Sequence, residues 1–353
     1  MAAQSPPKPI TLTQTAAILR NVVKVGFIAI ILMMVGRVFF TSLIAYIKSL
    51  TPPKQLPPTV GFKQLPKLPF PVQPNVPKSY TLETVGGQLP SFGDRAKVFF
   101  MPTAQASLTA VDRAKKKASG LGYLFEPEII DSRMYRWTLT SPLLATLQMD
   151  ILTGTFTIST NWSAHPELLT KKQTISSTTL IERVKSTLQQ ANSLSADVST
   201  GPARTKLVKT IGGQLTEADS LSDADFLEVD LYRKPVDEKY SSVTARGKQG
   251  PVHALVASDG TILEMIQNVY PVEYQIVETY PLLSPDLAWK TLSAGAGYVA
   301  QKGTSDTATI RTMSLAYFEP DEETPYYRPV YVFESKEGFV GMVDAIDPIW
   351  IQK

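Results

Sequence analysis

The longest apolar run of the chain covers residues 25–47. Of these 23 residues only Arg37, Thr41 and Ser42 are clearly polar, and a helix of this length crosses the hydrocarbon core of a bilayer. The run is too long for the apolar region of a signal peptide, and no small-residue cleavage site follows it. We therefore predict an uncleaved transmembrane helix within residues 22–48.

The larger, C-terminal part of the chain repeats one pattern three times, a helix followed by three strands. In Thr178–Ala191 apolar residues fall on one helical face, whereas in Leu144–Ile151 they alternate with polar ones. We delimit the three αβ units at residues 79–170, 171–279 and 280–353. Because short turns join the strands, we predict an α+β fold with largely antiparallel sheets and helices on one face of each sheet.

The third unit opens with a helix whose two ends are both marked in YPLLSPDLAWKTLSAGAGYV, residues 280–299. Ser284 suits the N-cap, and Pro285 fits the first helical position, where no amide donor is needed. Gly295 tolerates the left-handed backbone that ends many helices. Its glycines follow a helix and not a strand, so they do not form a dinucleotide-binding fingerprint.

Between the apolar run and the first unit the chain is rich in proline. Nine of the 28 residues from Thr51 to Lys78 are proline, and such runs favour an extended geometry of about 3.1 Å per residue. We predict a basic, semi-rigid stalk over residues 49–78 that spans roughly 85 Å when fully extended. A linker that touches the body in places is the alternative.

The charge of the chain changes after the stalk. Nine Lys and Arg residues precede the first acid, Glu83, whereas the rest of the chain has 26 Lys and Arg against 32 Asp and Glu. A basic stem therefore precedes an acidic body. The stem suits contact with membrane lipids that carry anionic head groups, with a solvated flank as the alternative. The acidic body argues against a nucleic-acid partner.

The chain has no cysteine and only two histidines, His165 and His253. This excludes disulfides, thiol catalysis and cysteine-ligated metal centres, and leaves few triad chemistries. Acidic residues at 219–225 and 321–323 lack the order of a calcium-binding loop and suit solvated loops. We predict no catalytic residue, no cofactor and no metal site, and thus a protein that is not an enzyme.

Arg37 is the first of the residues that we predict to bind a partner. It lies near the middle of the predicted membrane helix, where a charge costs roughly 2.5–3.5 kcal/mol on insertion scales. Its helical face carries mostly small and polar residues, the kind that packs membrane helices together: Gly26, Ala29, Met33 and Thr41. Arg37 would pair with a polar or acidic group of another membrane protein. A snorkelling arginine on a lone anchor is the alternative.

A second predicted contact surface lies on an aromatic and arginine-rich strand of the third unit. Its partner-binding residues are Tyr327, Arg328 and Tyr331. Tyrosine and arginine are common anchors at protein interfaces. Core packing of the same side chains is the alternative.

The third unit resembles a known regulatory module. The helix with Ser284 and Trp289, followed by IRTMSLAYFEP and YYRPVYVFESKEGFVGMVDAI, is similar to the C-terminal module of YycH/YycI-type extracytoplasmic proteins and to PepSY-like domains. That resemblance implies one membrane helix, an extracytoplasmic αβ body and regulation of a membrane histidine kinase by contact. Through the proline-rich stem, YTLETVGGQLPSF and ADFLEVDLYR, the whole chain also resembles membrane-anchored surface proteins of Patescibacteria-type bacteria.

Together these features predict a non-catalytic, membrane-anchored binding or regulatory protein. A short tail, residues 1–21, would be cytoplasmic, and the C-terminal body would be extracytoplasmic. The expected partners are membrane lipids and another membrane protein, such as a sensor kinase or a surface assembly. A structural accessory subunit of a cell-surface or pilus-like assembly is the alternative, because the basic stem and the long stalk suit it equally. A hydrolase is a third possibility.

Overall fold

A computed structural model describes residues 20, 22–27, 32–37, 39–43, 57–72, 76–84, 86–169, 172 and 175–352. The chain forms two compact units, Met1–Pro57 and Pro58–Lys353. The first unit contains one helix, Val22–Leu43, that is long and apolar enough to cross a membrane, with a mean hydropathy of 2.2. A helix of this kind serves as a membrane span or as a signal sequence. The predicted apolar helix near the N-terminus is therefore present.

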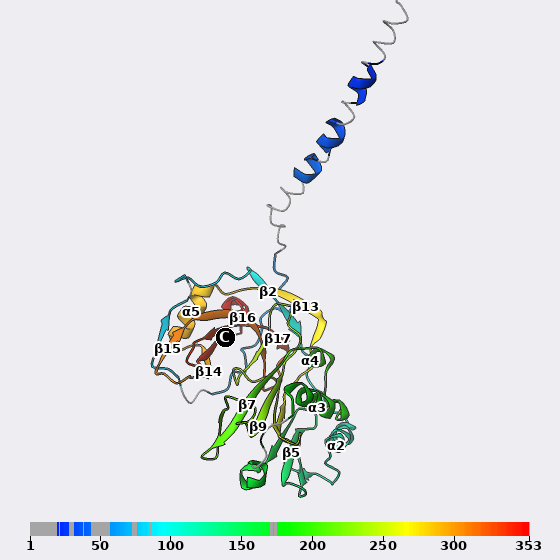
Figure 1. Cartoon of the computed structure of the whole chain (residues 1–353), viewed down its shortest axis with the longest axis vertical. Coiled ribbons are helices and arrows are strands. Elements are labelled where there is room, and N and C mark those ends of the chain that lie inside the picture. The colour runs from blue at the N-terminus through cyan, green and yellow to red at the C-terminus, as the bar shows by residue number, and fades with distance from the viewer. Residues whose placement is uncertain are drawn as a thin grey trace, which may run out of the picture. The chain divides into compact units, whose positions relative to one another are not determined.

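The largest layer of the second unit is an antiparallel sheet of nine strands, which include β5, β7 and β9 in Figure 1. Burial alternates along β5, where Leu147 and Met149 face the core and Gln148 faces water. Alternation of this kind marks a sheet with one covered face. In spatial order the strands are β3 (Glu128–Ile129), β4 (Met134–Leu139), β5 (Ala145–Asp150), β6 (Phe156–Thr160), β12 (Ile262–Gln267), β11 (Val252–Ala257), β9 (Phe226–Leu231), β7 (Ala203–Ile211) and β8 (Gln214–Glu217).

Helices cover one face of this sheet, and α2 and α3 lie beside it in Figure 1. The α3 helix begins at the N-cap Ser176, whose side chain accepts a hydrogen bond from the Thr179 amide. Its buried residues Leu180, Val184 and Leu188 recur at helical spacing and pack on the sheet. The helices on this layer are α2 (Ala110–Gly120), α3 (Ser177–Gln190) and α4 (Ala196–Ser199), and two 3₁₀ turns follow β6: η1 (Trp162–Ala164) and η2 (Pro166–Leu169).

A second sheet of five strands carries α5 (Pro285–Ser293) on one face. The α5 residues Ala288 and Leu292 pack there against Tyr331 and Phe333 of the sheet. The first pair of strands is parallel and the others are antiparallel. In spatial order the strands are β10 (Ser242–Thr244), β16 (Thr312–Glu319), β18 (Pro329–Glu334), β19 (Val340–Asp344) and β14 (Tyr298–Gln301).

Two small sheets connect the beginning of the body to its end. In one, β2 (Arg95–Phe100) pairs antiparallel with β13 (Glu273–Pro281) and with β17 (Tyr326–Tyr327). In the other, β1 (Ser79–Leu82) pairs parallel with β15 (Thr307–Ile310). A 3₁₀ turn, η3 (Pro348–Trp350), follows the last strand. Residues at the two ends of the body are therefore neighbours in space.

The prediction of an α+β fold with mostly antiparallel sheets is confirmed, but the division into three helix-plus-three-strand units is wrong. Strand β12 of the predicted second unit pairs with β6 of the first, with Met265 opposite Ile158. Strands β1 and β2 of the predicted first unit pair with strands of the third. Local periodicity marks single elements correctly, whereas hydrogen bonding between strands decides which elements share a sheet.

The described part of the predicted stalk packs against the body instead of extending from it. Leu65 is fully buried, and its amide donates to the Trp350 carbonyl at 2.8 Å. The Phe70 ring stacks on Tyr298 with 4.8 Å between ring centroids. Burial of these side chains favours docking over free extension. Residues 44–56 and 73–75 of this region, and the predicted tail except Arg20, lie outside the described residues.

The two ends of α5 agree with the sequence prediction. The Ser284 side chain accepts a hydrogen bond from the Leu287 amide at 3.4 Å, and Pro285 occupies the first helical position. Gly295 follows the helix with a φ of 78°, and its amide donates to the Leu292 carbonyl at 2.9 Å. This is the left-handed cap that the sequence predicts.

We expect Gly295→Val to lower the melting temperature of the body. A Cβ at Gly295 would meet no atom within 4 Å, so the cost comes only from the left-handed backbone, about 1–2 kcal/mol for a side-chain-bearing residue. Gly295→Asn is the control, because asparagine tolerates this backbone. Thermal melting of the full chain in detergent, followed by tryptophan fluorescence, measures both. An unchanged transition in the valine variant would contradict the cap assignment.

Candidate functional site

A buried arginine, Arg233, lies where the sheets of the body meet. Its side chain is 2% exposed, and its Nε donates to both carboxylate oxygens of Glu319, at 2.8 and 3.1 Å. Its Nη1 donates to Asp197 and its Nη2 donates to the Tyr270 carbonyl. Arg233 follows β9 of the nine-stranded sheet, Glu319 ends β16 of the five-stranded sheet, and Asp197 lies in α4. One side chain therefore joins three layers.

Two tyrosines complete this buried ion cluster. The Tyr327 hydroxyl donates to Glu319 at 3.1 Å, and the Arg233 guanidinium lies 5.6 Å from the centre of the Tyr327 ring. The Tyr274 hydroxyl donates to Asp197 at 2.8 Å. These contacts bring β17 and β13 of the three-stranded sheet into the same cluster. Polar groups buried to this extent are stable only when they are paired.

Burial and opposite charge act against each other in the cluster. Burial works against the ionised carboxylate of Asp197, but Arg233 holds its pKa below the ordinary value. Burial raises the pKa of Glu319, and Arg233 opposes that rise. Burial also opposes the charge of Arg233, yet the two carboxylates hold its pKa above the ordinary value. The charges therefore stabilise one another, and removal of one partner would leave the others buried without compensation.

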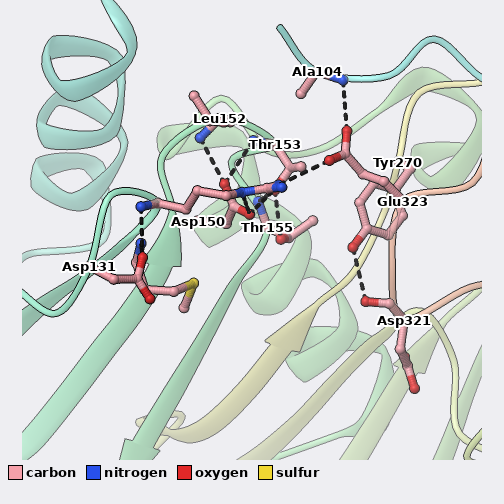
Figure 2. A network of polar contacts seen from close by, with 11 residues as sticks. Ala104, Asp131, Asp150, Leu152, Thr153, Thr155, Tyr270, Asp321 and Glu323 are labelled. Carbon is pink, nitrogen blue, oxygen red and sulfur yellow. Dashed lines mark hydrogen bonds and ion pairs between the residues drawn. The ribbon is translucent and has the colours of Figure 1, made fainter. Parts of the chain in front are cut away.

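A second polar network lies at one end of the nine-stranded sheet, between the β5–β6 turn and the loop after β16 (Figure 2). The Arg133 side chain donates to Asp150 Oδ2 from Nε at 3.0 Å and from Nη2 at 2.6 Å. The same Nη2 donates to Glu323 at 2.9 Å, and Glu323 also accepts from the Ala104 amide at 2.7 Å. Hydrogen bonds to Glu323 and Asp150 raise the pKa of Arg133 above its ordinary value.

The loop after β16 is held at its other end by Asp321. The Tyr270 hydroxyl donates to the Asp321 carbonyl at 3.0 Å, as Figure 2 shows. The Asp321 side chain accepts from Arg246 and, at 3.2 Å, from the amide of Asn268. The loop that the sequence assigned to solvated charges is thus fixed to the nine-stranded sheet by ion pairs and hydrogen bonds.

This network lines a pocket of about 470 Å³. Four carboxylates face it against one guanidinium, so it favours cations and hydrogen-bond donors over anions. Such a lining is suited to recognise an amine or a guanidinium group. The lining residues are Arg133, Met134, Gln148, Asp150, Thr155, Phe156, Thr157, Asn268, Tyr270, Asp321, Glu322 and Glu323.

Three of the four residues predicted to bind a partner are buried in the body. Tyr327, Arg328 and Tyr331 are 1%, 2% and 0% exposed. Tyr327 belongs to the buried ion cluster, Arg328 pairs with Asp344 at 3.0 Å, and the Tyr331 hydroxyl donates to the Leu283 carbonyl at 2.7 Å. A contact surface made of these three side chains is therefore not present. The physical reason is that both faces of β18 are covered by apolar side chains.

Arg37 is the fourth predicted contact residue, and it lies in the helix Val22–Leu43 with an exposed side chain. Its carbonyl accepts a hydrogen bond from the Thr41 hydroxyl at 2.9 Å. Its pairing with another membrane protein stays a prediction.

The sequence did not point to the buried ion cluster. Arg233 lies 36 positions from Asp197 and 86 positions from Glu319, so no local motif joins them. A weak signal was available, because Arg233 and Glu319 each end an apolar strand, where a charge is shielded from water only if another layer covers it.

No family model, curated protein or solved structure matches this chain. Among the described residues, no group of three or more His, Asp or Glu side chains is arranged to hold a metal ion. The function is therefore inferred from the geometry of specific residues.

We expect Arg233→Met to reduce the free energy of unfolding by about 3–5 kcal/mol, because it leaves Glu319 and Asp197 buried without their counter-charge. Arg133→Met is the matched control: its side chain is 44% exposed, and ion pairs screened by water contribute roughly 0–1 kcal/mol. Urea denaturation followed by tryptophan fluorescence reports on the body alone, since all four tryptophans lie in it. Equal, small losses in both variants would contradict the role of Arg233.

Proposed function

We propose that this protein is a single-pass membrane protein that binds and regulates another membrane protein, and that it is not an enzyme. In this proposal the helix Val22–Leu43 spans the membrane, the N-terminal tail is cytoplasmic and the body is extracytoplasmic. The observation that carries it is Arg37, a charged residue inside a helix with a mean hydropathy of 2.2.

A charge at the centre of a membrane helix needs a partner or a route to water. At the helix centre an arginine costs roughly 2.5–3.5 kcal/mol on insertion scales. Among the residues that the structure describes, no carboxylate pairs with Arg37. Gly26 and Gly36 have no atom within 4 Å of a Cβ built on them, so this helix offers room for close approach by another helix. A partner helix with an acidic or polar residue would satisfy both features.

The body supports a role in recognition. Its sheets are joined by the buried ion cluster around Arg233, which favours a single stiff scaffold. The acidic pocket beside Arg133 is fixed on that scaffold and is suited to a lysine or arginine of a partner. Contact through the membrane helix and contact through the body would then act on the same partner.

The resemblance of residues 280–353 to YycH/YycI-type and PepSY-like modules supports regulation over mere attachment. Proteins of that type regulate a membrane histidine kinase by contact, which makes a sensor kinase the first partner to test. The basic stem supports an additional contact with anionic lipid head groups.

A structural role in a surface assembly is the second candidate, and the edges of the nine-stranded sheet favour it. Strand β8 is an outer strand with only β7 as its neighbour, and Ile211 beside it is 59% exposed. Open edges of this kind can pair with another chain. A large ring or fibre that co-purifies with the protein would favour this role, whereas a stoichiometric membrane protein would favour regulation.

We expect Arg37→Leu to reduce the amount of co-purified membrane partner about tenfold, which corresponds to a loss of about 1.4 kcal/mol of pairing energy. The full chain would be extracted from membranes in mild detergent, and its partners quantified by mass spectrometry against wild type.

Two matched variants control this experiment. Arg37→Lys keeps the positive charge and should retain the partner, whereas Arg20→Leu removes a charge that precedes the helix and should have little effect. If Arg37→Leu leaves every co-purifying membrane protein in place, the proposed contact is wrong.

A further inference from the structure

A second pocket, of about 720 Å³, lies on the helix side of the nine-stranded sheet. One wall is α2, the opposite wall is the C-terminal end of α3, and the floor is the β5–β6 turn with the last residues of β5. This is the same turn whose other side carries the Arg133 network of Figure 2. The lining residues are Arg113, Ala114, Lys116, Lys117, Met149, Ile151, Leu152, Thr153, Gly154, Gln190, Ala191 and Asn192.

The charge of this pocket is opposite to that of the acidic one. Arg113, Lys116 and Lys117 are three and four positions apart, so all three lie on one face of α2. No carboxylate is among the lining residues, and the described residues contain no ion-pair partner for these three side chains. The neighbouring Lys115 differs, because it pairs with Glu126 at 2.6 Å. The pocket thus collects three cationic side chains without a counter-charge.

Lys117 is the innermost of these cations. Its Nζ donates to the Gly154 carbonyl at 3.0 Å, and a Cβ at Gly154 would lie 2.6 Å from that Nζ, so the turn leaves space for the ammonium group. Burial, and then the charge of Arg113, lower the pKa of Lys117. An anion in the pocket would relieve both effects.

The helix dipole does not account for the whole cluster. Lys117 lies in the last turn of α2, where a cation is favourable. Arg113 lies at the end of the first turn, where the dipole disfavours a positive charge. On the opposite wall, Gln190 and Asn192 supply side-chain amides that can donate hydrogen bonds. Both walls therefore present donors to the same space.

We propose that this pocket binds a phosphate group. Its side chains offer point charges and a guanidinium, the groups that proteins use for phosphate. The phosphate could belong to a free, soluble ligand or to a lipid head group, and the chemistry of recognition is the same for both. This site is independent of the contact proposed for Arg37.

Amine labelling of the full chain tests the site. The protein would be placed in nanodiscs of phosphatidylcholine, and the rate at which an amine reagent modifies Lys117 would be measured by peptide mass spectrometry. Inorganic phosphate should slow labelling of Lys117 about fivefold against potassium chloride of equal ionic strength, because a bound anion raises the pKa of the amine and covers it. Lys115 in the same molecule is the internal control and should change less than about twofold.

A second arm identifies the source of the phosphate. Nanodiscs that contain phosphatidylglycerol, without added phosphate, should protect Lys117 if the natural ligand is a lipid head group, and protection by inorganic phosphate alone would indicate a soluble ligand. In Arg113→Met, which removes one cation without touching the labelled amine, the protection should fall markedly. The proposal is overturned if neither arm protects Lys117, or if Arg113→Met retains full protection.

Discussion

The structure of the body depends on the buried pairing of Arg233 with Glu319 and Asp197. An arginine that is 2% exposed is stable only if its charge is matched, and the matching carboxylates come from different layers of the fold. Separation of the nine-stranded sheet from the five-stranded sheet would expose three charges to unequal surroundings at once. Apolar packing fills the space between helices and sheets, but this cluster fixes how the layers meet, because hydrogen bonds to a guanidinium are directional.

The placement of the two pockets follows from that constraint. The loop after β16 belongs to the five-stranded layer, yet Asp321 and Glu323 hold it against the end of the nine-stranded sheet (Figure 2). The β5–β6 turn lies between the acidic pocket and the basic pocket beside α2, so the position of one turn shapes both. A protein anchored by one membrane helix can use such a scaffold to present two surfaces of opposite charge to its surroundings.

Much of the local structure was predictable from the sequence. The caps of α5 at Ser284 and Gly295, and the Asp259–Gly260 turn between β11 and β12, carry their geometry in the residue types themselves. The assembly of strands into sheets was not predictable, because the partners of β6 and β2 lie far along the chain. The site was missed for the same reason, and Tyr331 was assigned to a surface because a strand covered on both faces lacks the alternation that marks its buried side.

Native-state hydrogen exchange of the full chain in detergent tests most directly whether the Arg233 cluster unites the layers. The account predicts that the slowest amides of β9 and of β18 exchange with the same opening free energy, because neither sheet can open while the cluster is intact. It also predicts that in Arg233→Met the two sets of amides separate, with β18 opening at lower free energy. Independent, weaker protection of β18 already in the wild-type protein would contradict the account.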